Sequence, residues 1–104
     1  MTKDIKTFGA YLRSLRESSK MTLKNVAEKI SIDPSLLAKI ERSERQPTKE
    51  FINSVAAVFN IDPKALQSEF LSDLIAYKIL NEDADINILK VAESKVLYLK
   101  NIQK

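Results

Sequence analysis

Apolar residues recur at spacings of three and four along most of the chain. No useful length alternates with the period of two that marks a half-buried strand. The first stripe, formed by Phe8, Leu12 and Leu15, predicts a helix over roughly Thr7–Ser19. The last stripe predicts a helix over roughly residues 85–101 and consists of Leu89, Ala92, Val96 and Leu99. The pattern therefore predicts an all-α fold.

Capping residues predict where the helices between these two begin. Thr22 and Thr48 each precede an apolar stripe, and a threonine hydroxyl can accept a hydrogen bond from the first turn of a helix. Asp33-Pro34 and Asp62-Pro63 give a stronger signal, because proline at the first helical position loses no hydrogen bond. The helix after Asp33 is expected to run to about Arg42. After Asp62 the apolar pattern continues to Leu80, so helices there are expected to merge or kink, before the acidic break at residues 81–85.

Composition removes most enzyme classes. The 104 residues suffice for one compact domain with a short appendage, and they include one Gly, three Pro, no Cys and no His. Disulfide scaffolds, Cys or His zinc sites, histidine-dependent triads and glycine-rich phosphate loops are thereby excluded. An enzyme that uses carboxylates alone would lack a nucleophile and a convergent pocket. We therefore expect no catalytic residues and no cofactor.

Two further observations concern metal binding and the cellular location of the protein. Asp83, Asp85 and Asn87 mimic the start of a calcium loop, but Ile88 and Ser94 stand where that loop needs Gly and Glu, so no metal is expected. The N-terminal sequence has no apolar signal region, and no stretch approaches a membrane span. A cytoplasmic protein without a membrane partner is the expectation.

The positive charge is concentrated in the first part of the chain. Residues 1–60 carry 11 Lys and Arg against 7 Asp and Glu, whereas residues 61–104 carry 6 against 7. A basic unit followed by a near-neutral tail favours a polyanion-binding domain, although a solvated charged surface gives the same pattern.

Only three residues, Ser31, Ile32 and Asp33, separate the second and third predicted helices. So short a connection forces the helices to cross steeply. This is the geometry of a helix-turn-helix, whose second helix can enter the major groove of DNA. An ordinary corner in a helical bundle fits the spacing equally well.

The residues themselves distinguish these alternatives. The run from Met21 to Pro47 resembles the Cro/C1-type helix-turn-helix family, most specifically in Ala27, in Ile40-Glu41-Arg42 and in the Arg45-x-Pro47-Thr48 segment. The resemblance covers about residues 7–66. It implies a five-helix, lambda-repressor-like DNA-binding domain over residues 1–66 and a helical extension over residues 67–104.

The resemblance also implies roles for individual positions. Residues at base-reading positions of the third helix are Pro34, Ser35, Leu36, Ala38 and Lys39. Residues at positions that contact DNA phosphates are Thr22, Lys24, Asn25, Arg42 and Arg45. A serine hydroxyl can bond several bases and lysine can donate to guanine, whereas contacts to phosphate give affinity and register without sequence information.

Arg16 and Glu41 match family positions that pair inside the domain, so both are expected to be structural. Three positions depart from the family pattern. Leu23 replaces a glutamine that commonly bridges to phosphate, and is expected to pack against the tail instead. Ser31 and Ser43 replace glycines that often adopt a left-handed backbone, which costs a non-glycine residue about 1 kcal/mol.

The tail is too apolar to remain exposed. Its stripe of Leu89, Ala92, Val96 and Leu99 spans about two heptads, too few for an independent coiled coil. We expect a helical hairpin that forms a dimer interface; packing against Phe70, Leu74 and Tyr77 of the same chain is the alternative. A basic helix-turn-helix with such a tail also resembles the controller proteins of restriction–modification systems.

These observations predict a transcriptional regulator that binds double-stranded DNA sequence-specifically. It is expected to act as a homodimer, with the recognition helix at about Asp33–Arg42 in the major groove of a palindromic operator. The alternative is an antitoxin-like or adaptor protein whose C-terminal helices bind a partner protein.

Overall fold

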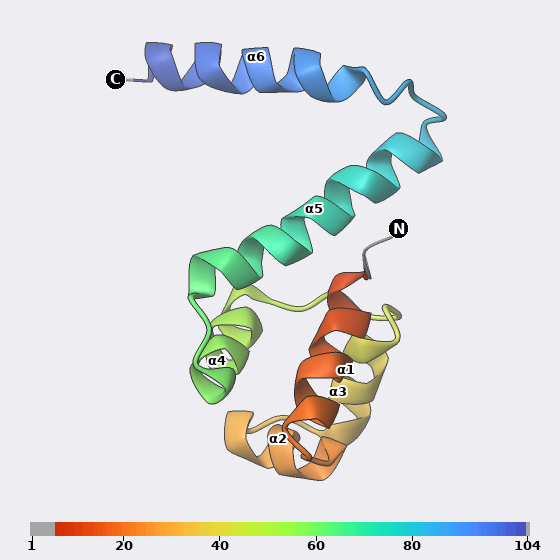
Figure 1. Cartoon of the computed structure of the whole chain (residues 1–104), viewed down its shortest axis with the longest axis vertical. Helices are drawn as coiled ribbons and strands as arrows, with labels where there is room; N and C mark the ends of the chain where they lie inside the picture. Colours follow the sequence, from red (N-terminus) through yellow and green to blue (C-terminus); the bar gives the residue numbers. More distant parts are fainter. Residues whose placement is uncertain (1–5, 104) are drawn as a thin grey trace. The chain divides into compact units, whose positions relative to one another are not determined.

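The computed structural model describes residues 6–103, and every regular element in that range is an α-helix. The six helices are α1 (Phe8–Ser18), α2 (Leu23–Ile30), α3 (Pro34–Glu41), α4 (Lys49–Phe59), α5 (Pro63–Asn81) and α6 (Ile88–Ile102). Figure 1 shows their order along the chain. The predicted all-α class is confirmed.

Side-chain caps begin the first four helices. The hydroxyls of Thr7, Thr22 and Thr48 each accept a hydrogen bond from a backbone N–H of the following turn, and the carboxylate of Asp33 does the same for α3. Two of these helices have only eight residues, too few for an isolated helix to be stable in water. Their caps and their packing therefore stabilise them together.

The start of α6 differs from the prediction. The helix begins at Ile88 rather than near residue 85, and no side chain caps it. The carboxylate of Asp85 accepts a hydrogen bond from the N–H of Asn87 at 2.8 Å, and the carbonyl of Asp85 accepts one from Ile88 at 2.9 Å. Asp85 thus closes a tight turn before the helix instead of opening the helix itself.

The chain divides into two compact units, one that extends to Asp73 and one that begins at Leu74. The first half of α5 therefore belongs to the N-terminal unit, and the expected boundary after residue 66 falls within this continuous helix. The C-terminal unit holds the end of α5, a turn and α6. No helix of the described chain is long and apolar enough to cross a membrane.

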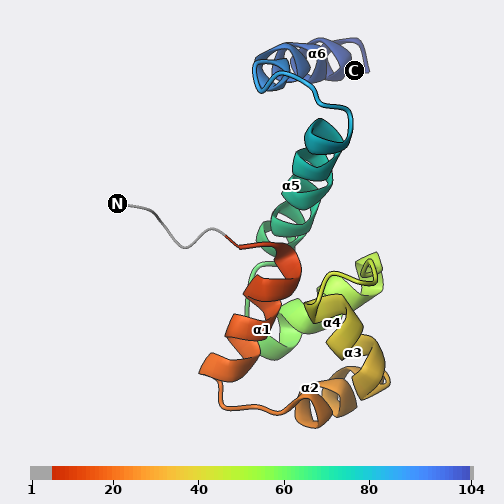
Figure 2. The same ribbon diagram turned by 90° about the vertical axis from the view of Figure 1, so that its right-hand side faces the viewer.

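One cluster of apolar side chains forms the core of the N-terminal unit. Its buried members are Phe8, Leu12, Val26, Ala27, Leu37, Ile40, Phe51, Ile52, Val55, Ala56 and Leu66. Leu23 packs against this cluster, which accounts for its apolar character without the tail. Helices α1 to α4, drawn in Figures 1 and 2, supply all of these buried residues except Leu66, which lies on α5.

The first half of α5 is fixed to the N-terminal unit by its packing in the core and by two contacts with α1. Leu66 is buried in the core, and the ring of Phe70 meets that of Phe8 edge to face at a centroid distance of 5.7 Å. The backbone N–H of Phe8 donates to the carboxylate of Asp73 at 2.8 Å. An acidic group at a helix N-terminus also interacts favourably with the helix dipole.

Gly9 lies where α1 crosses α3. A Cβ atom at this position would be 2.5 Å from the backbone carbonyl oxygens of both Ile40 and Glu41. Since these neighbours are backbone atoms, they cannot rotate away as a flexible side chain could. Gly9 therefore permits the close approach that holds α3 on the core.

Two left-handed residues follow helices at positions where the family pattern often has glycine. Ser31 follows α2 with a φ of 60°, and Ser43 follows α3 with a φ of 62°. At both positions a non-glycine residue adopts the conformation that glycine favours. Ser31 thereby sets the sharp turn from α2 into α3.

Candidate nucleic-acid interface

Helices α2 and α3 form the expected helix-turn-helix. The backbone N–H groups of Ser31 and Ile32 donate back to the last turn of α2, at Ala27 and Glu28. The chain then turns at Ser31, the left-handed C-cap of α2, and Asp33 caps α3. Figures 1 and 2 both show α3 leaving α2 at a steep angle.

Helix α3 has an inner and an outer face. Leu37, Ile40 and Glu41 are buried against the rest of the unit. Pro34, Ser35 and Lys39 are exposed, with Ser35 and Lys39 one helical turn apart. The outer face can therefore present a hydroxyl and an ammonium group to a ligand.

The other two residues expected to read bases are less exposed than these three. Leu36 and Ala38 are half-buried, and Leu36 packs against the core cluster. Part of the Leu36 side chain is thus committed to the fold.

Asp33 organises the first turn of α3. One of its carboxylate oxygens accepts hydrogen bonds from both the backbone N–H and the hydroxyl of Ser35, each at 2.7 Å. These bonds lower the pKa of Asp33 from its ordinary value, the hydroxyl bond having the larger effect. The carboxylate is consequently ionised at neutral pH.

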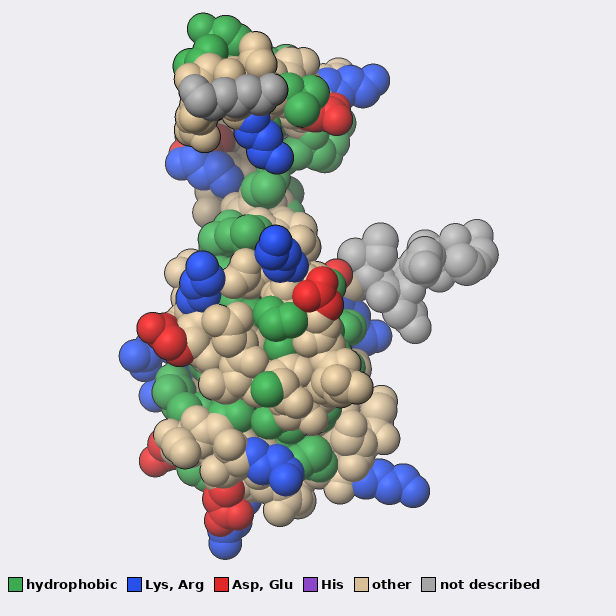
Figure 3. Space-filling view, turned by 90° about the vertical axis from the view of Figure 1, so that its left-hand side faces the viewer, with side chains coloured by type: hydrophobic (Ala, Val, Ile, Leu, Met, Phe, Trp, Pro, Cys, Tyr) green, Lys and Arg blue, Asp and Glu red, His purple; other side chains and the backbone are tan. Residues whose placement is uncertain are grey.

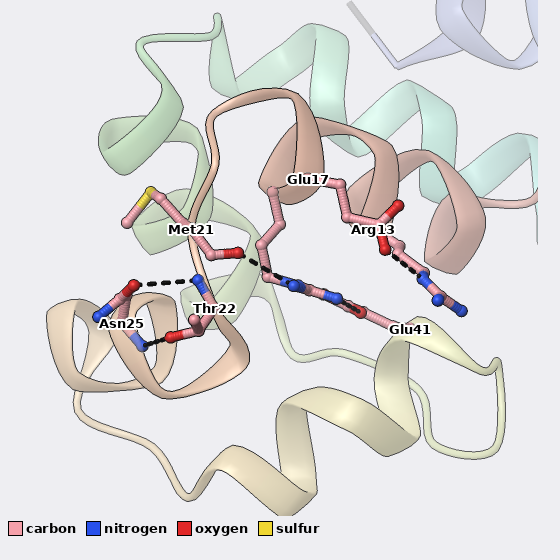
Figure 4. A network of polar contacts seen from close by, with 7 residues as sticks. Arg13, Glu17, Met21, Thr22, Asn25 and Glu41 are labelled. Atoms are coloured by element: carbon pink, nitrogen blue, oxygen red, sulfur yellow. Dashed lines mark hydrogen bonds and ion pairs between the residues drawn. The ribbon is translucent and has the colours of Figure 1, made fainter.

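Thr22 and Asn25 form a reciprocal capping box at the start of α2 (Figure 4). The hydroxyl of Thr22 accepts from the N–H of Asn25, and the side-chain oxygen of Asn25 accepts from the N–H of Thr22, both at 3.0 Å. This arrangement uses the acceptors and leaves the Thr22 hydroxyl proton and the Asn25 amide protons available to donate. Both residues are exposed, so an anion can reach these donors.

The three cations expected at the phosphates differ in their surroundings. Lys24 and Arg45 are exposed. Arg42 is also exposed, but its guanidinium donates to Glu44 at 2.8 and 3.2 Å. This pair lowers the pKa of Glu44, mainly through the hydrogen bond. Glu44 therefore competes with any phosphate for Arg42, a feature that sequence reasoning missed.

Arg16 and Glu41, expected from the sequence to pair, are in contact inside the unit. The guanidinium donates to the two carboxylate oxygens of Glu41 at 2.8 and 3.0 Å. The side chains are only 11% and 5% exposed. The hydrogen bond to Glu41 raises the pKa of Arg16 from its ordinary value. A bidentate pair of this kind fixes orientation as well as distance.

Arg16 also contacts the segment before α2. Its guanidinium donates to the backbone carbonyl of Met21 at 3.0 Å, and Figure 4 shows this carbonyl and the Glu41 carboxylate meeting the same group. Arg16 therefore joins α1, the connection to α2 and the end of α3. Sequence reasoning missed Met21, because its acceptor is a backbone carbonyl, a group that every residue type has.

The four residues expected at the dimer interface, Leu89, Ala92, Val96 and Leu99, are all exposed on α6. Helix α6 buries none of its residues. Figure 3 shows apolar side chains uncovered on the C-terminal unit, at the top of the picture. Among the described residues, no group of three or more acidic side chains could hold a metal ion.

Comparisons with known proteins agree with this geometry. Residues 7–68 match the family model described as a helix-turn-helix domain. The restriction-modification controller protein C.AhdI from Aeromonas hydrophila is 28% identical, with a TM-score of 0.55 over 61% of this chain and 96% of that one. SinR, the master regulator for biofilm formation, was solved in complex with DNA and is 28% identical, with a TM-score of 0.53 over 58% of this chain and 97% of that one.

A third solved structure, the clp gene regulator ClgR from Corynebacterium glutamicum, is 26% identical, with a TM-score of 0.57 over 86% of this chain and 89% of that one. No curated protein sequence matches significantly. The helix-turn-helix fold predicted from residues 21–47 is confirmed by these similarities.

Proposed function

The chain belongs to the helix-turn-helix domain family of DNA-binding transcriptional regulators, and we propose that it acts as a homodimer on a palindromic operator. Helix α3, together with its capping residues Asp33 and Arg42, lies in the major groove. The observation that carries the proposal is the division of α3 into a buried face and an exposed polar face. The groove is about 12 Å wide and accommodates one α-helix.

Base reading is assigned to the outer face of α3. Lys39 donates to guanine, Ser35 bonds a base edge, and Pro34 packs on a thymine methyl group. Leu36 and Ala38 contribute apolar contacts through the parts of their side chains that remain exposed. The exposure of Pro34, Ser35 and Lys39 supports this assignment.

Phosphate contacts are assigned to Thr22, Lys24, Asn25, Arg42 and Arg45. The donors of Thr22 and Asn25 are oriented by the capping box, at a helix N-terminus that attracts anions. Lys24, Arg42 and Arg45 add positive charge, which neutralises phosphates and makes binding salt-dependent. These residues lie within the stretch 7–68 that matches the helix-turn-helix family model, and SinR, a similar structure, is described in complex with DNA.

Dimerisation is assigned to the C-terminal unit. On α6, Leu89, Ala92, Val96 and Leu99 form one apolar stripe, and Ile88, Val91, Tyr98 and Ile102 form a second stripe beside it that Lys95 interrupts. Together the stripes cover about half of the helix circumference. One neighbouring helix covers a narrower stripe than this, so α6 requires more than one helix to bury its apolar face.

A gel-shift titration tests DNA recognition. The full chain is titrated onto the DNA upstream of its own gene at about 150 mM salt, close to the physiological ionic strength, with a scrambled competitor. A discrete complex that resists the competitor is expected. Lys39→Ala should weaken this complex by roughly tenfold or more and bind random DNA almost unchanged. Lys90→Ala on α6 has the same charge change and should have little effect on either DNA.

Sedimentation tests the dimer. Val96→Glu places a charge in the first stripe of α6, whereas Leu97→Glu places the same charge away from both stripes. The wild type and Leu97→Glu are expected to sediment as dimers and Val96→Glu as a monomer. A dimer that survives in Val96→Glu would place the interface elsewhere.

The exposed apolar face of α6 also favours a second function, in which the C-terminal helices bind a partner protein. In that case the wild-type chain alone would be monomeric at micromolar concentration. It would become a stable complex only after mixing with the product of a neighbouring gene.

A further inference from the structure

The hydroxyl of Ser35 has a fixed hydrogen-bond polarity. It lies 2.7 Å from the same oxygen of Asp33 that accepts the backbone N–H of Ser35. An ionised carboxylate has no proton to donate, so the hydroxyl must be the donor in this pair. The proton of Ser35 therefore points at Asp33, and only the lone pairs of Oγ remain for another partner.

This hydroxyl stands on the outer face of α3 together with Lys39. Both residues are exposed and are separated by four positions, so they share one side of the helix. The ammonium group of Lys39 can only donate. The outer face thus presents an acceptor at Ser35 and a donor at Lys39, one helical turn apart.

The base edges in the major groove differ in whether they donate or accept a hydrogen bond. Adenine and cytosine present amino groups that donate, at N6 and N4, whereas the O6 of guanine and the O4 of thymine only accept. A freely rotating hydroxyl could serve either kind of base. A hydroxyl tied to a carboxylate can donate to guanine or thymine only if the bond to Asp33 breaks.

We propose that Ser35 is a specificity-determining acceptor that selects adenine or cytosine over guanine or thymine at one position of each half-site, with Asp33 as its positioning residue. The proposal rests on the DNA-binding function above. It adds a rule for the operator: the base that faces Ser35 carries an amino group, and a base facing Lys39 carries an acceptor. Reversing the base pair at the Ser35 position exchanges amino and keto groups, so an A·T to T·A change weakens binding.

The test begins with sequences selected by the wild-type chain from randomised double-stranded DNA. Each base pair of the selected half-site is then changed to the other three, and affinities are measured by fluorescence anisotropy. Ser35→Ala locates the position that Ser35 reads. There the wild type should favour A or C over G or T by roughly three- to tenfold, and Ser35→Ala should lose this preference.

Two substitutions of Asp33 test its positioning role. Asp33→Asn keeps a side-chain oxygen that accepts the Ser35 proton, so the preference for A or C is expected to remain. Asp33→Gly removes that acceptor and is well tolerated at a helix N-cap. It should bind G or T at this position nearly as well as A or C, and keep its preferences at the position read by Lys39. Circular dichroism melting of each variant verifies that α3 remains folded.

The outcomes separate this proposal from the one it rests on. If the wild type selects no sequence, both proposals are wrong. If the wild type selects an operator but prefers G or T at the Ser35-dependent position, only the present proposal is overturned. The same holds if no position depends on Ser35, or if Asp33→Gly keeps the full preference for A or C.

Discussion

The two units of the molecule stabilise their helices in different ways. The N-terminal unit buries a continuous apolar cluster, begins four helices with side-chain caps and encloses an Arg–Glu pair. In residues 74–103 no side chain is buried, and α6 has no side-chain cap. The first unit has a buried core of its own, whereas the second exposes its apolar side chains, the surface to which we assigned dimerisation. Mutations in the first should therefore change folding or DNA binding, and mutations in the second should change association.

The strongest test of this comparison removes one member of the buried ion pair. Arg16→Ala leaves the buried Glu41 carboxylate without its partner, and should lower the free energy of unfolding by about 3–5 kcal/mol. Arg13→Ala is the control, because its pair with Glu17 is exposed and should contribute less than about 1 kcal/mol. Urea unfolding followed by circular dichroism measures both. An unchanged stability in Arg16→Ala, with DNA binding weakened, would reassign Arg16 to the phosphates.

Gly9→Ala should have the next largest effect. The added methyl group would overlap the carbonyl oxygens of Ile40 and Glu41, so α1 and α3 must move apart at a cost of about 2–3 kcal/mol. Thermal melting measures the loss, and Ser18→Ala at an exposed position of the same helix serves as control. Cross-linking of the folded variant should still yield dimers. A variant that melts normally yet loses the dimer would contradict the separation of the two units.

Ser31→Gly should sharpen the comparison by stabilising the N-terminal unit. Glycine adopts the left-handed conformation at this turn without strain, and the gain is about 0.5–1 kcal/mol after the greater freedom of the unfolded chain is included. Ser19→Gly is the control. Ser19 follows α1 with a φ of −86°, where glycine has no such advantage. Chemical denaturation should show a higher midpoint for Ser31→Gly only. Equal responses of the two variants would argue against a strained turn at Ser31.

Glu44→Gln should affect DNA binding and leave both folding and association unchanged. The substitution removes the carboxylate that occupies the Arg42 guanidinium, so affinity for any DNA should rise roughly two- to threefold at low salt. Glu69→Gln on α5 matches the change in charge. Anisotropy titrations at several salt concentrations distinguish the two variants. Similar gains for both would indicate a general effect of net charge rather than the release of Arg42.

The smallest expected effect is on the stability of the protein at acidic pH. Hydrogen bonds from Ser35 lower the pKa of Asp33 in the folded protein, so the carboxylate cap contributes stability above its ordinary value of 3.8. That contribution is lost as the pH falls below 3.8 through the lowered pKa. Asp33→Asn does not titrate, and its stability should fall less steeply between about pH 5 and pH 3 in urea unfolding. A slope in Asp33→Asn equal to that of the wild type would contradict this role of the carboxylate.

Sequence reasoning recovered the features that are encoded locally. Thr22, Asp33 and Thr48 are recognisable caps, and they set the starts of α2, α3 and α4. It missed the start of α6, because Asp85 can close a turn as readily as it can cap a helix. The role of Gly9 depends on the backbone of α3, some thirty residues away in sequence. The only available signal was a single glycine inside a helix, where it costs about 1 kcal/mol relative to alanine.

At the site, too, the features that depend on residues far apart in the sequence could not be predicted from local patterns. The contact between Arg16 and Glu41 was expected from family resemblance, since no spacing rule links residues so far apart in sequence. The competition of Glu44 for Arg42 depends on a left-handed turn at Ser43, which brings a loop carboxylate back toward the helix end. The sequence showed the residues, but not that they meet.

The two faces of α3 have a consequence for how such a regulator evolves. The residues that fix the helix to the core, Leu37, Ile40 and Glu41, are separate from Ser35 and Lys39 on its outer face. Replacing the outer residues changes the chemistry offered to a base without disturbing the packing beneath it. A duplicated gene could therefore acquire a different set of target promoters through two or three substitutions while its product still folds in the same way. The eight residues of α3 therefore allow the set of regulated genes to change while the fold stays the same.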